Sequence, residues 1–252
     1  MKKIGEIFQR LFGVPWLVFG VQHFLYADFV AGLVPAIFPA RIFWVYLTGA
    51  AMIAAGLAFI FNRKALLAAA LLGMMLSMFV LLIHIPKFAG GDLSAISWTR
   101  RLQDLAIAAA AFILAGILSQ REAKNNLLKN ISKVSRYLFA ILLIVFGVQQ
   151  FLNPDFLTAK VPVYLPFRMF WVYLTGTAMV LTGASVLINK KGRLTAISLG
   201  AFLLLINLLH HGYLVANGWH TPLFWTAAML DLAITCGVFI LAGDLCEEEV
   251  SL

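Results

Sequence analysis

Three kinds of charged or titratable residue recur at matching positions in the two halves of this sequence. They form pairs separated by 127 positions: His84 and His211, Asp104 and Asp231, and Arg41 and Arg168. A carboxylate beside an imidazole or a guanidinium can hold or transfer a proton, or bind the polar head of a ligand. These residues are therefore the first candidates for a functional site.

The partner of the two aspartates must be common to both halves if the pairing is a shared feature. Two arginines precede Asp104 by one helical turn, but alanines stand at the equivalent positions in the second half. We therefore predict the ion pairs Arg41–Asp104 and Arg168–Asp231, with the histidines as a pH-dependent alternative. Pairs of this kind could equally serve only to hold the helices together.

Six more polar and aromatic residues are candidate ligand contacts near the same predicted membrane face. They are Gln22, His23, Trp44, Gln103, Gln149 and Trp171. Tryptophans at this level also form the ordinary aromatic belt of a membrane protein. A histidine at a helix end can also be purely structural, with its imidazole hydrogen-bonded to the backbone and to no ligand.

The sequence gives little support for catalysis by this chain alone. It contains no phosphate-binding loop, dinucleotide fingerprint, nucleophile elbow or H-E-x-x-H motif. Its five histidines are spread along the chain, whereas a metal site needs several convergent ligands. We therefore predict no metal and no identifiable cofactor other than a candidate quinone, and the sequence singles out no catalytic residue.

The composition predicts an integral membrane protein. Apolar residues make up 62% of the 252 residues and charged residues 12%, whereas a soluble domain carries about 25% charged residues. The net charge of +8 comes from short basic clusters between apolar runs. That distribution is typical of membrane topology, so the expected partner is the lipid bilayer and not nucleic acid.

Eight apolar segments are expected to cross the bilayer as helices, which need about 20 residues each. They are 8–26, 42–61, 65–85, 99–118, 137–152, 169–188, 194–214 and 223–243. The fifth is short, and we expect Lys133 and Arg136 to extend it by snorkelling. We do not interpret the first as a cleaved signal peptide, because it has a counterpart in the second half. Most basic residues lie on the side of both termini, which predicts a bacterial inner-membrane protein with cytoplasmic termini.

The segment Phe-Trp-Val-Tyr-Leu-Thr-Gly at 43–49 returns unchanged at 170–176. Four helices per half give both halves the same orientation, so the repeat is parallel. We predict an all-α, polytopic fold of eight transmembrane helices in two parallel four-helix repeats. The expected division is a first repeat at 1–118, a basic cytoplasmic linker at 119–135, a second repeat at 136–243 and an acidic cytoplasmic tail at 244–252.

Glycines recur seven positions apart in the second helix of each predicted repeat. They are Gly49 and Gly56 in the first half, and Gly176 and Gly183 in the second. A seven-residue spacing places both glycines on one helix face, where a neighbouring helix can approach closely. We predict that these positions serve helix packing.

Each half resembles the DoxX-like family of small four-helix membrane proteins. The resemblance lies in Phe-Gly-Val-Gln-His-Phe at 19–24, Tyr-Leu-Thr-Gly at 46–49 with Gly56, Leu-Ile-His-Ile-Pro at 82–86, and Trp98 with Leu-Gln-Asp-Leu-Ala at 102–106. The second half departs from the pattern, with Gln150 at the position of His23 and Leu230 at that of Gln103. The resemblance therefore implies that the first half is the better candidate for a site.

The family resemblance implies several roles, which include membrane subunits and partners of redox or detoxification enzymes and receptor chaperones. Our leading prediction is a protein that binds a small apolar molecule, a quinone or a lipid, in an outward-facing polar cup. Since the chain carries no haem, flavin or thiol signature, it would act as a subunit or partner of a membrane redox system. The alternatives are a non-catalytic scaffold or assembly factor for a partner protein, and a small-molecule transporter.

Overall fold

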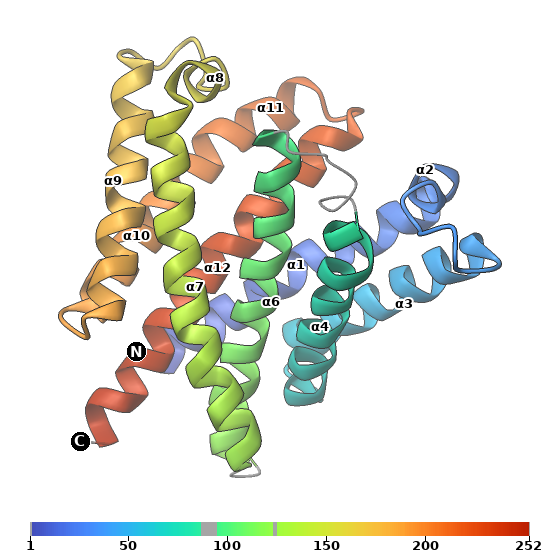
Figure 1. The fold of residues 1–252 in the computed structure, drawn as a ribbon, viewed down its shortest axis with the longest axis horizontal. Coiled ribbons are helices and arrows are strands. Elements are labelled where there is room, and N and C mark those ends of the chain that lie inside the picture. Colours follow the sequence, from blue (N-terminus) through green and yellow to red (C-terminus); the bar gives the residue numbers. More distant parts are fainter. Residues whose placement is uncertain (1, 87–94, 123–124, 252) are drawn as a thin grey trace.

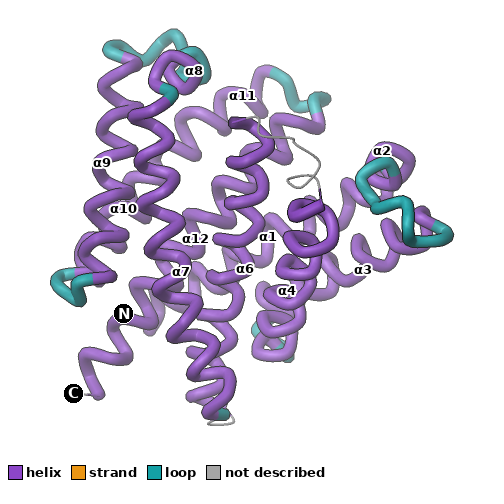
Figure 2. Tube along the Cα trace, in the orientation of Figure 1, coloured by secondary structure: helices purple, strands orange, loops and turns teal. Residues whose placement is uncertain are grey.

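The computed structural model describes residues 2–86, 95–122 and 125–251, and their arrangement is shown in Figure 1. All regular secondary structure in these ranges is helical (Figure 2). The prediction of an all-α fold is confirmed for the described part of the chain. Long apolar runs favour helices because a helix satisfies every backbone N–H and C=O group within the segment.

The helices of the two halves follow the same order. The first half contains α1 (Lys2–Leu25), α2 (Ala27–Ala31), α3 (Arg41–Ile60), α4 (Ala65–Phe79), the π-helical turn η1 (Val80–His84) and α6 (Ala95–Glu122). The second half contains α7 (Asn126–Leu152), α8 (Pro154–Thr158), α9 (Arg168–Leu187), α10 (Gly192–Ile206), the π-helical turn η2 (Asn207–His211), α11 (Gly212–Asn217) and α12 (Pro222–Ser251). From α3 to η1 and from α9 to η2, corresponding bounds differ by the 127 positions of the sequence repeat.

Seven helical stretches of the described chain are long and apolar enough to cross a membrane. They are Arg41–Ile60, Ala65–His84, Arg101–Glu122, Asn126–Leu152, Arg168–Leu187, Gly192–Asn217 and Pro222–Cys246. Helix α1 has 24 residues but is not among them, and its apolar run is interrupted by Gln9, Arg10 and Gln22. The seven stretches are compatible with a multi-pass membrane protein, and the eighth span stays a prediction.

Most of the polar stretch 119–135 is helical. Helix α6 extends to Glu122 and α7 begins at Asn126. The Asn125 side chain accepts hydrogen bonds from the backbone N–H groups of Leu127 and Leu128 at 2.9 and 3.3 Å. This N-cap supplies partners for N–H groups that a helix start leaves unpaired. It explains why α7 is longer than the apolar run from which it was predicted.

Arg136 differs from the prediction made for it. The expectation that it snorkels out of the fifth segment is wrong, because its side chain is buried and its Nε donates to Oδ2 of Asp244 at 2.7 Å. A buried guanidinium needs such a partner, since desolvation of an isolated charge is costly. The bond joins α7 to α12, so Asp244 is a packing residue of α12.

Helices α6 and α12 lie near the middle of the molecule and contact each other (Figure 1). The spanning stretch of α6 is 72% buried, against 28% in α3. Residues 106–111 of α6 are alanines and one isoleucine, and each is at most 1% exposed. Small side chains allow helix backbones to approach closely, which is the main source of packing energy between helices in lipid. The core is therefore built around α6 and α12.

The two halves interlock around this core. Helix α1 packs against α3 and also against α12, while α7 packs against α9 and also against α6. The first helix of each half thus contacts the fourth helix of the other half. Helices α4 and α10 pack against α6 and α12, respectively, within their own halves. Each half therefore depends on the other to bury its first helix.

Glycines allow the closest helix contacts in both halves. A Cβ atom on Gly20 would lie 2.7 Å from the carbonyl oxygen of Gly49, and one on Gly13 would lie 2.5 Å from that of Gly56. Both contacts join α1 to α3. The same close approach joins α7 to α9, at Gly147, Gly176 and Gly183. The prediction that the repeated glycines serve helix packing is confirmed.

Candidate functional site

Each half of the protein joins one histidine to one aspartate by a short hydrogen bond. Nε2 of His84 lies 2.7 Å from Oδ2 of Asp104, and Nε2 of His211 lies 2.7 Å from Oδ2 of Asp231. An ionised carboxylate can only accept hydrogen bonds, so the proton between the two side chains belongs to Nε2. The carboxylate thereby fixes the tautomer and the orientation of the imidazole.

The predicted ion pairs Arg41–Asp104 and Arg168–Asp231 are wrong, because a histidine bonds to the aspartate in both halves. The reason is the order in which the helices pack. Helix α6 contacts α4 and η1, and α12 contacts α10 and η2, so the histidine segments lie directly beside the aspartates. Arg41 begins α3 and is exposed, and Arg168 begins α9.

The histidines end two π-helical turns. Helices α4 and α10 are regular for 15 residues each and then widen into η1 and η2, which end at His84 and His211. A residue inserted into an α-helix turns the following side chains by about 100° around the helix axis. Single π-helical turns are rare and often occur at functional sites. Their presence at both equivalent positions indicates that they orient the histidines.

The two pairs differ in their exposure. The side chains of His84 and Asp104 are 17% and 27% exposed, whereas those of His211 and Asp231 are 6% and 48% exposed. In both halves the carboxylate is more accessible than the imidazole. A ligand can therefore reach either aspartate at the surface of the helix bundle.

The second imidazole nitrogen of His211 stands out among the polar atoms of the site. Its Nδ1 is buried and has no hydrogen-bond partner within the described part of the chain, and the same is true of Nδ1 of His210. The two rings lie edge to face with their centroids 4.5 Å apart. A buried polar atom without a partner is costly and calls for an explanation, such as a ligand that supplies the missing bond.

Gln22 and Gln149 connect the two halves of the protein. Gln22 Nε2 donates to the carbonyl oxygen of Pro222 at 3.2 Å, and its Oε1 accepts from the Thr226 hydroxyl at 3.1 Å. Gln149 Oε1 accepts from the Thr99 hydroxyl at 3.4 Å. The same Gln–Thr pair thus occurs at the α1–α12 and α6–α7 interfaces. We did not predict a role for Thr99 and Thr226 from the sequence, although they too are 127 positions apart.

His23 and Gln103 lie on the same helices as the residues above. His23 is half-buried, and its Nδ1 lies 2.8 Å from the carbonyl oxygen of Phe19, one turn earlier in α1. Gln103 is half-buried beside Asp104 on α6. The bond of His23 stays within its own helix, so His23 does not join the His84–Asp104 pair.

The repeated tryptophans bond to the loops that precede their helices. Nε1 of Trp44 donates to the carbonyl oxygen of Pro39 at 3.1 Å, and Nε1 of Trp171 donates to that of Pro166 at 2.9 Å. These bonds fix the loop at the start of α3 and of α9. Their indole N–H groups are therefore occupied by the protein itself.

No group of three or more His, Cys, Asp or Glu side chains in the described ranges could hold a metal ion. The candidate site is thus two separate His–Asp pairs, one in each half. Such a pair can hold a proton at a defined nitrogen and present a carboxylate to a polar ligand group.

Comparison with protein families gives one match, to a domain of unknown function (DUF8561) over residues 139–221. The match begins within α7, covers α9, α10 and η2, and ends before α12, so it includes His211 but not Asp231. No curated protein and no solved structure matches the chain. The matched family carries no stated activity, so function must be argued from the geometry of the two pairs.

Proposed function

We propose that this chain is a bacterial inner-membrane protein of DoxX-like type that binds a small apolar molecule with a polar head, a quinone or a lipid. The His–Asp pairs would bind the polar head, and a membrane redox partner would supply any electron transfer. The observation that carries the proposal is the 2.7 Å His–Asp hydrogen bond that occurs in both halves. Ionisable residues within membrane helices are costly and usually mark a site.

The proposal includes an arrangement of eight transmembrane helices in two parallel repeats, with both termini in the cytoplasm. The equal spacing of corresponding helix bounds supports the repeats. The basic turns Asn62–Lys64 and Asn189–Lys191 support the orientation, because basic residues favour the cytoplasmic side. In this orientation the His–Asp pairs lie toward the outer face of the membrane.

The chemistry of binding follows from the bond to the aspartate. Because Nε2 donates to the carboxylate, Nδ1 of a neutral imidazole is left as an acceptor. A quinol or lipid hydroxyl can donate to that nitrogen, and a protonated imidazole can instead donate to a quinone carbonyl. The unpartnered Nδ1 of His211 supports this role in the second half.

Binding of decylubiquinone to the full chain in nanodiscs tests the proposal, with quenching of tryptophan fluorescence as the measurement. We expect Asp104→Asn and Asp231→Asn each to weaken binding at the pair that they alter. A hydrogen bond to a charged group contributes about 1.5–3 kcal/mol, so the double variant should bind roughly 10- to 100-fold more weakly. Thr226→Val is the control, since it removes a helix contact without altering either pair. Equal binding by the wild type and the three aspartate variants would overturn the proposal.

The alternative of a non-catalytic scaffold has its own support. Four of the residues expected to contact a ligand, Gln22, Gln149, Trp44 and Trp171, bond instead to other parts of the chain. If packing is their only role, the purified protein carries no quinone or lipid at the His–Asp pairs. Isolation from native membranes would then recover a stable partner protein in fixed ratio, and recovery would be unchanged in the Asp104→Asn variant.

A further inference from the structure

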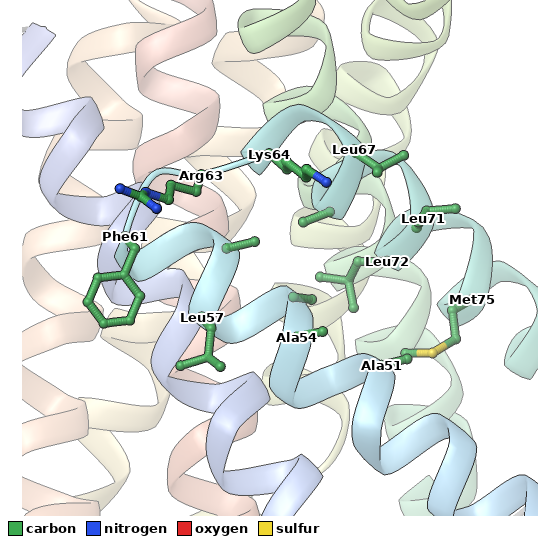
Figure 3. A pocket seen from close by; sticks show the side chains of 13 residues that line it. Ala51, Ala54, Leu57, Phe61, Arg63, Lys64, Leu67, Leu71, Leu72 and Met75 are labelled. Carbon is green, nitrogen blue, oxygen red and sulfur yellow. The ribbon is translucent and has the colours of Figure 1, made fainter.

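A groove of about 770 Å³ lies between α3 and α4, in the first half of the protein (Figure 3). Its walls are apolar apart from Arg63 and Lys64, which lie at one end, on the turn that joins the two helices. Ala51 and Met75 lie at the other end (Figure 3). The volume is within the range of about 300–1,000 Å³ that is usual for small-molecule sites.

The groove exists because α3 presents small side chains to α4. Ala54, Ala55 and Ala58 line it from α3, and Ala68 lines it from α4. The space between these alanines is left open because no larger side chain reaches across it. The groove is therefore a property of particular residues and not of the helix arrangement alone.

At several positions that line the groove the second half carries larger residues, although Ala184, Ile188 and Ser198 there are smaller than Leu57, Phe61 and Leu71. Leu181 stands where the first half has Ala54, and Phe202 stands where it has Met75. Thr182 and Thr195 replace Ala55 and Ala68, and the Thr182 hydroxyl donates to the carbonyl oxygen of Thr195 at 3.3 Å. That bond ties α9 to α10 where the first half is open. The second half therefore offers a comparison in which alanines of the groove are replaced by Leu181, Thr182 and Thr195.

The basic end of the groove is held in place by the fold. Lys64 has a left-handed backbone conformation, with φ of 55°, and its position before α4 fixes the direction of the turn. The backbone N–H of Arg63 donates to the carbonyl oxygen of Ala58 at 3.0 Å. The Asn62 side chain accepts from Gln9 of α1 at 2.7 Å. The backbone that carries the two cationic side chains is therefore held in a defined conformation.

Neither cation is neutralised by the protein. Arg63 and Lys64 are both exposed, and within the described residues neither forms an ion pair with a carboxylate. The rim of the groove is also open, because Leu57, Phe61 and Leu67 are exposed. In a bilayer these rim residues face hydrocarbon, and the two basic residues lie at the level of the lipid headgroups.

We infer that the groove binds one acyl chain of an anionic membrane phospholipid, with the lipid phosphate at Arg63 and Lys64. An apolar groove on a membrane-facing surface selects a hydrocarbon chain. Two unpaired cations at its end select a negative headgroup, since guanidinium and ammonium groups bind phosphate oxygens strongly. The positive-inside rule places this end in the cytoplasmic leaflet, where anionic lipids are abundant.

This site is separate from the His–Asp pairs. Arg63 and Lys64 precede α4, whereas His84 ends η1, and the stretch between them has 20 residues. At 1.5 Å per residue the two ends are about 30 Å apart. The inference therefore does not rest on the proposed quinone or lipid site, and its test uses neither quinone nor variants of the pairs.

Native mass spectrometry of the full chain, released from nanodiscs of equal parts phosphatidylglycerol and phosphatidylcholine, tests the inference. We expect the wild-type protein to retain one phosphatidylglycerol in preference to phosphatidylcholine. Near the membrane surface a basic residue contributes about 1 kcal/mol toward an anionic lipid, so Arg63→Ala with Lys64→Ala should lower the preference about 10- to 30-fold. Ala54→Leu, which copies the second half, should reduce retention of both lipids.

The matched control replaces the equivalent basic residues of the second half, Lys190→Ala with Lys191→Ala. We expect this variant to retain phosphatidylglycerol as the wild type does. If it loses the preference as fully as the Arg63 and Lys64 variant, the attraction is a general effect of surface charge and the site is refuted. Equal retention of both lipids by the wild type refutes it as well. Should Ala54→Leu fail to fold, the two charge variants still decide the outcome.

Discussion

Gly116 and Gly243 occupy equivalent positions of the repeat, yet the structure predicts opposite effects for the same substitution. A Cβ atom on Gly116 would collide with Cβ and Oγ of Ser132, which lies on α7. A Cβ atom on Gly243 would meet nothing within 4 Å. The difference arises because the residue equivalent to Ser132 is Gly5, which has no side chain to collide with.

The magnitudes follow from the contacts at each site. Alanine at 116 overpacks the α6–α7 interface, which costs about 1–3 kcal/mol. It also displaces the Ser132 hydroxyl, which donates to the carbonyl oxygen of Ile113 at 3.4 Å, with a loss of about 0.5–1.5 kcal/mol. The higher helix propensity of alanine offsets about 1 kcal/mol of this loss of stability. We therefore expect Gly116→Ala to destabilise the protein by roughly 2 kcal/mol and Gly243→Ala to stabilise it by up to about 1 kcal/mol.

Unfolding of the purified protein by sodium dodecyl sulfate, followed by far-UV circular dichroism, measures both effects under identical conditions. Adding Ser132→Gly to Gly116→Ala removes the colliding atoms and should recover most of the lost stability. The reasoning is refuted if Gly116→Ala is as stable as the wild type. It is also refuted if Gly243→Ala loses as much stability as Gly116→Ala does.

Three further predictions concern side-chain hydrogen bonds that hold the helices and loops in place. Gln22→Ala and Thr226→Val should show a coupling free energy of about 0.6 kcal/mol, and at most about 1.7 kcal/mol, in a double-mutant cycle; strict additivity would contradict the bond between the halves. Asp244→Asn removes the negative charge that faces the buried Arg136 guanidinium and should lower the free energy of unfolding by about 3–5 kcal/mol, whereas Arg136→Met combined with Asp244→Leu should recover much of that loss. Trp171→Phe removes the indole bond to the preceding loop and should cost about 0.5–1.5 kcal/mol; an unchanged denaturation midpoint would show that the bond contributes nothing.

The interlocked arrangement has a consequence for the whole molecule. Since α1 packs against α12 and α7 packs against α6, each half completes the other. The Gln–Thr bonds at the α1–α12 and α6–α7 interfaces give this pairing chemical specificity. A change at one interface therefore affects the packing of a helix from each half.

The fold class follows from the sequence alone. Runs of about 20 apolar residues must form helices in a bilayer, because backbone polar groups find no partners in hydrocarbon. The repeated glycines of α3 and α9 could likewise be interpreted correctly from their spacing. Both predictions depend only on residues close together in the chain, for which periodicity and composition are sufficient.

The candidate site could be predicted only in part. The repeat identified both the histidines and the aspartates, but our first choice of partner for Asp104 was Arg41, and the structure shows the alternative, His84. That choice depends on which helix lies beside α6 and on the π-helical turn that orients His84. The packing of one helix against another is not visible in periodicity or composition, and the apolar residues of η1 are aliphatic, like most of those of α4.

The same division separates the remaining features. The sequence by itself determined that this chain is apolar and helical and that many of its residues recur 127 positions apart, because those properties can be read along the chain. Only the tertiary structure decided that the first helix of each half packs against the fourth helix of the other half. It also decided that Gly116 is crowded while Gly243 is not, and that a groove lies between α3 and α4. These features depend on which side chain of a distant helix lies opposite each position. Two positions with the same residue in a sequence repeat can therefore have different neighbours in the structure.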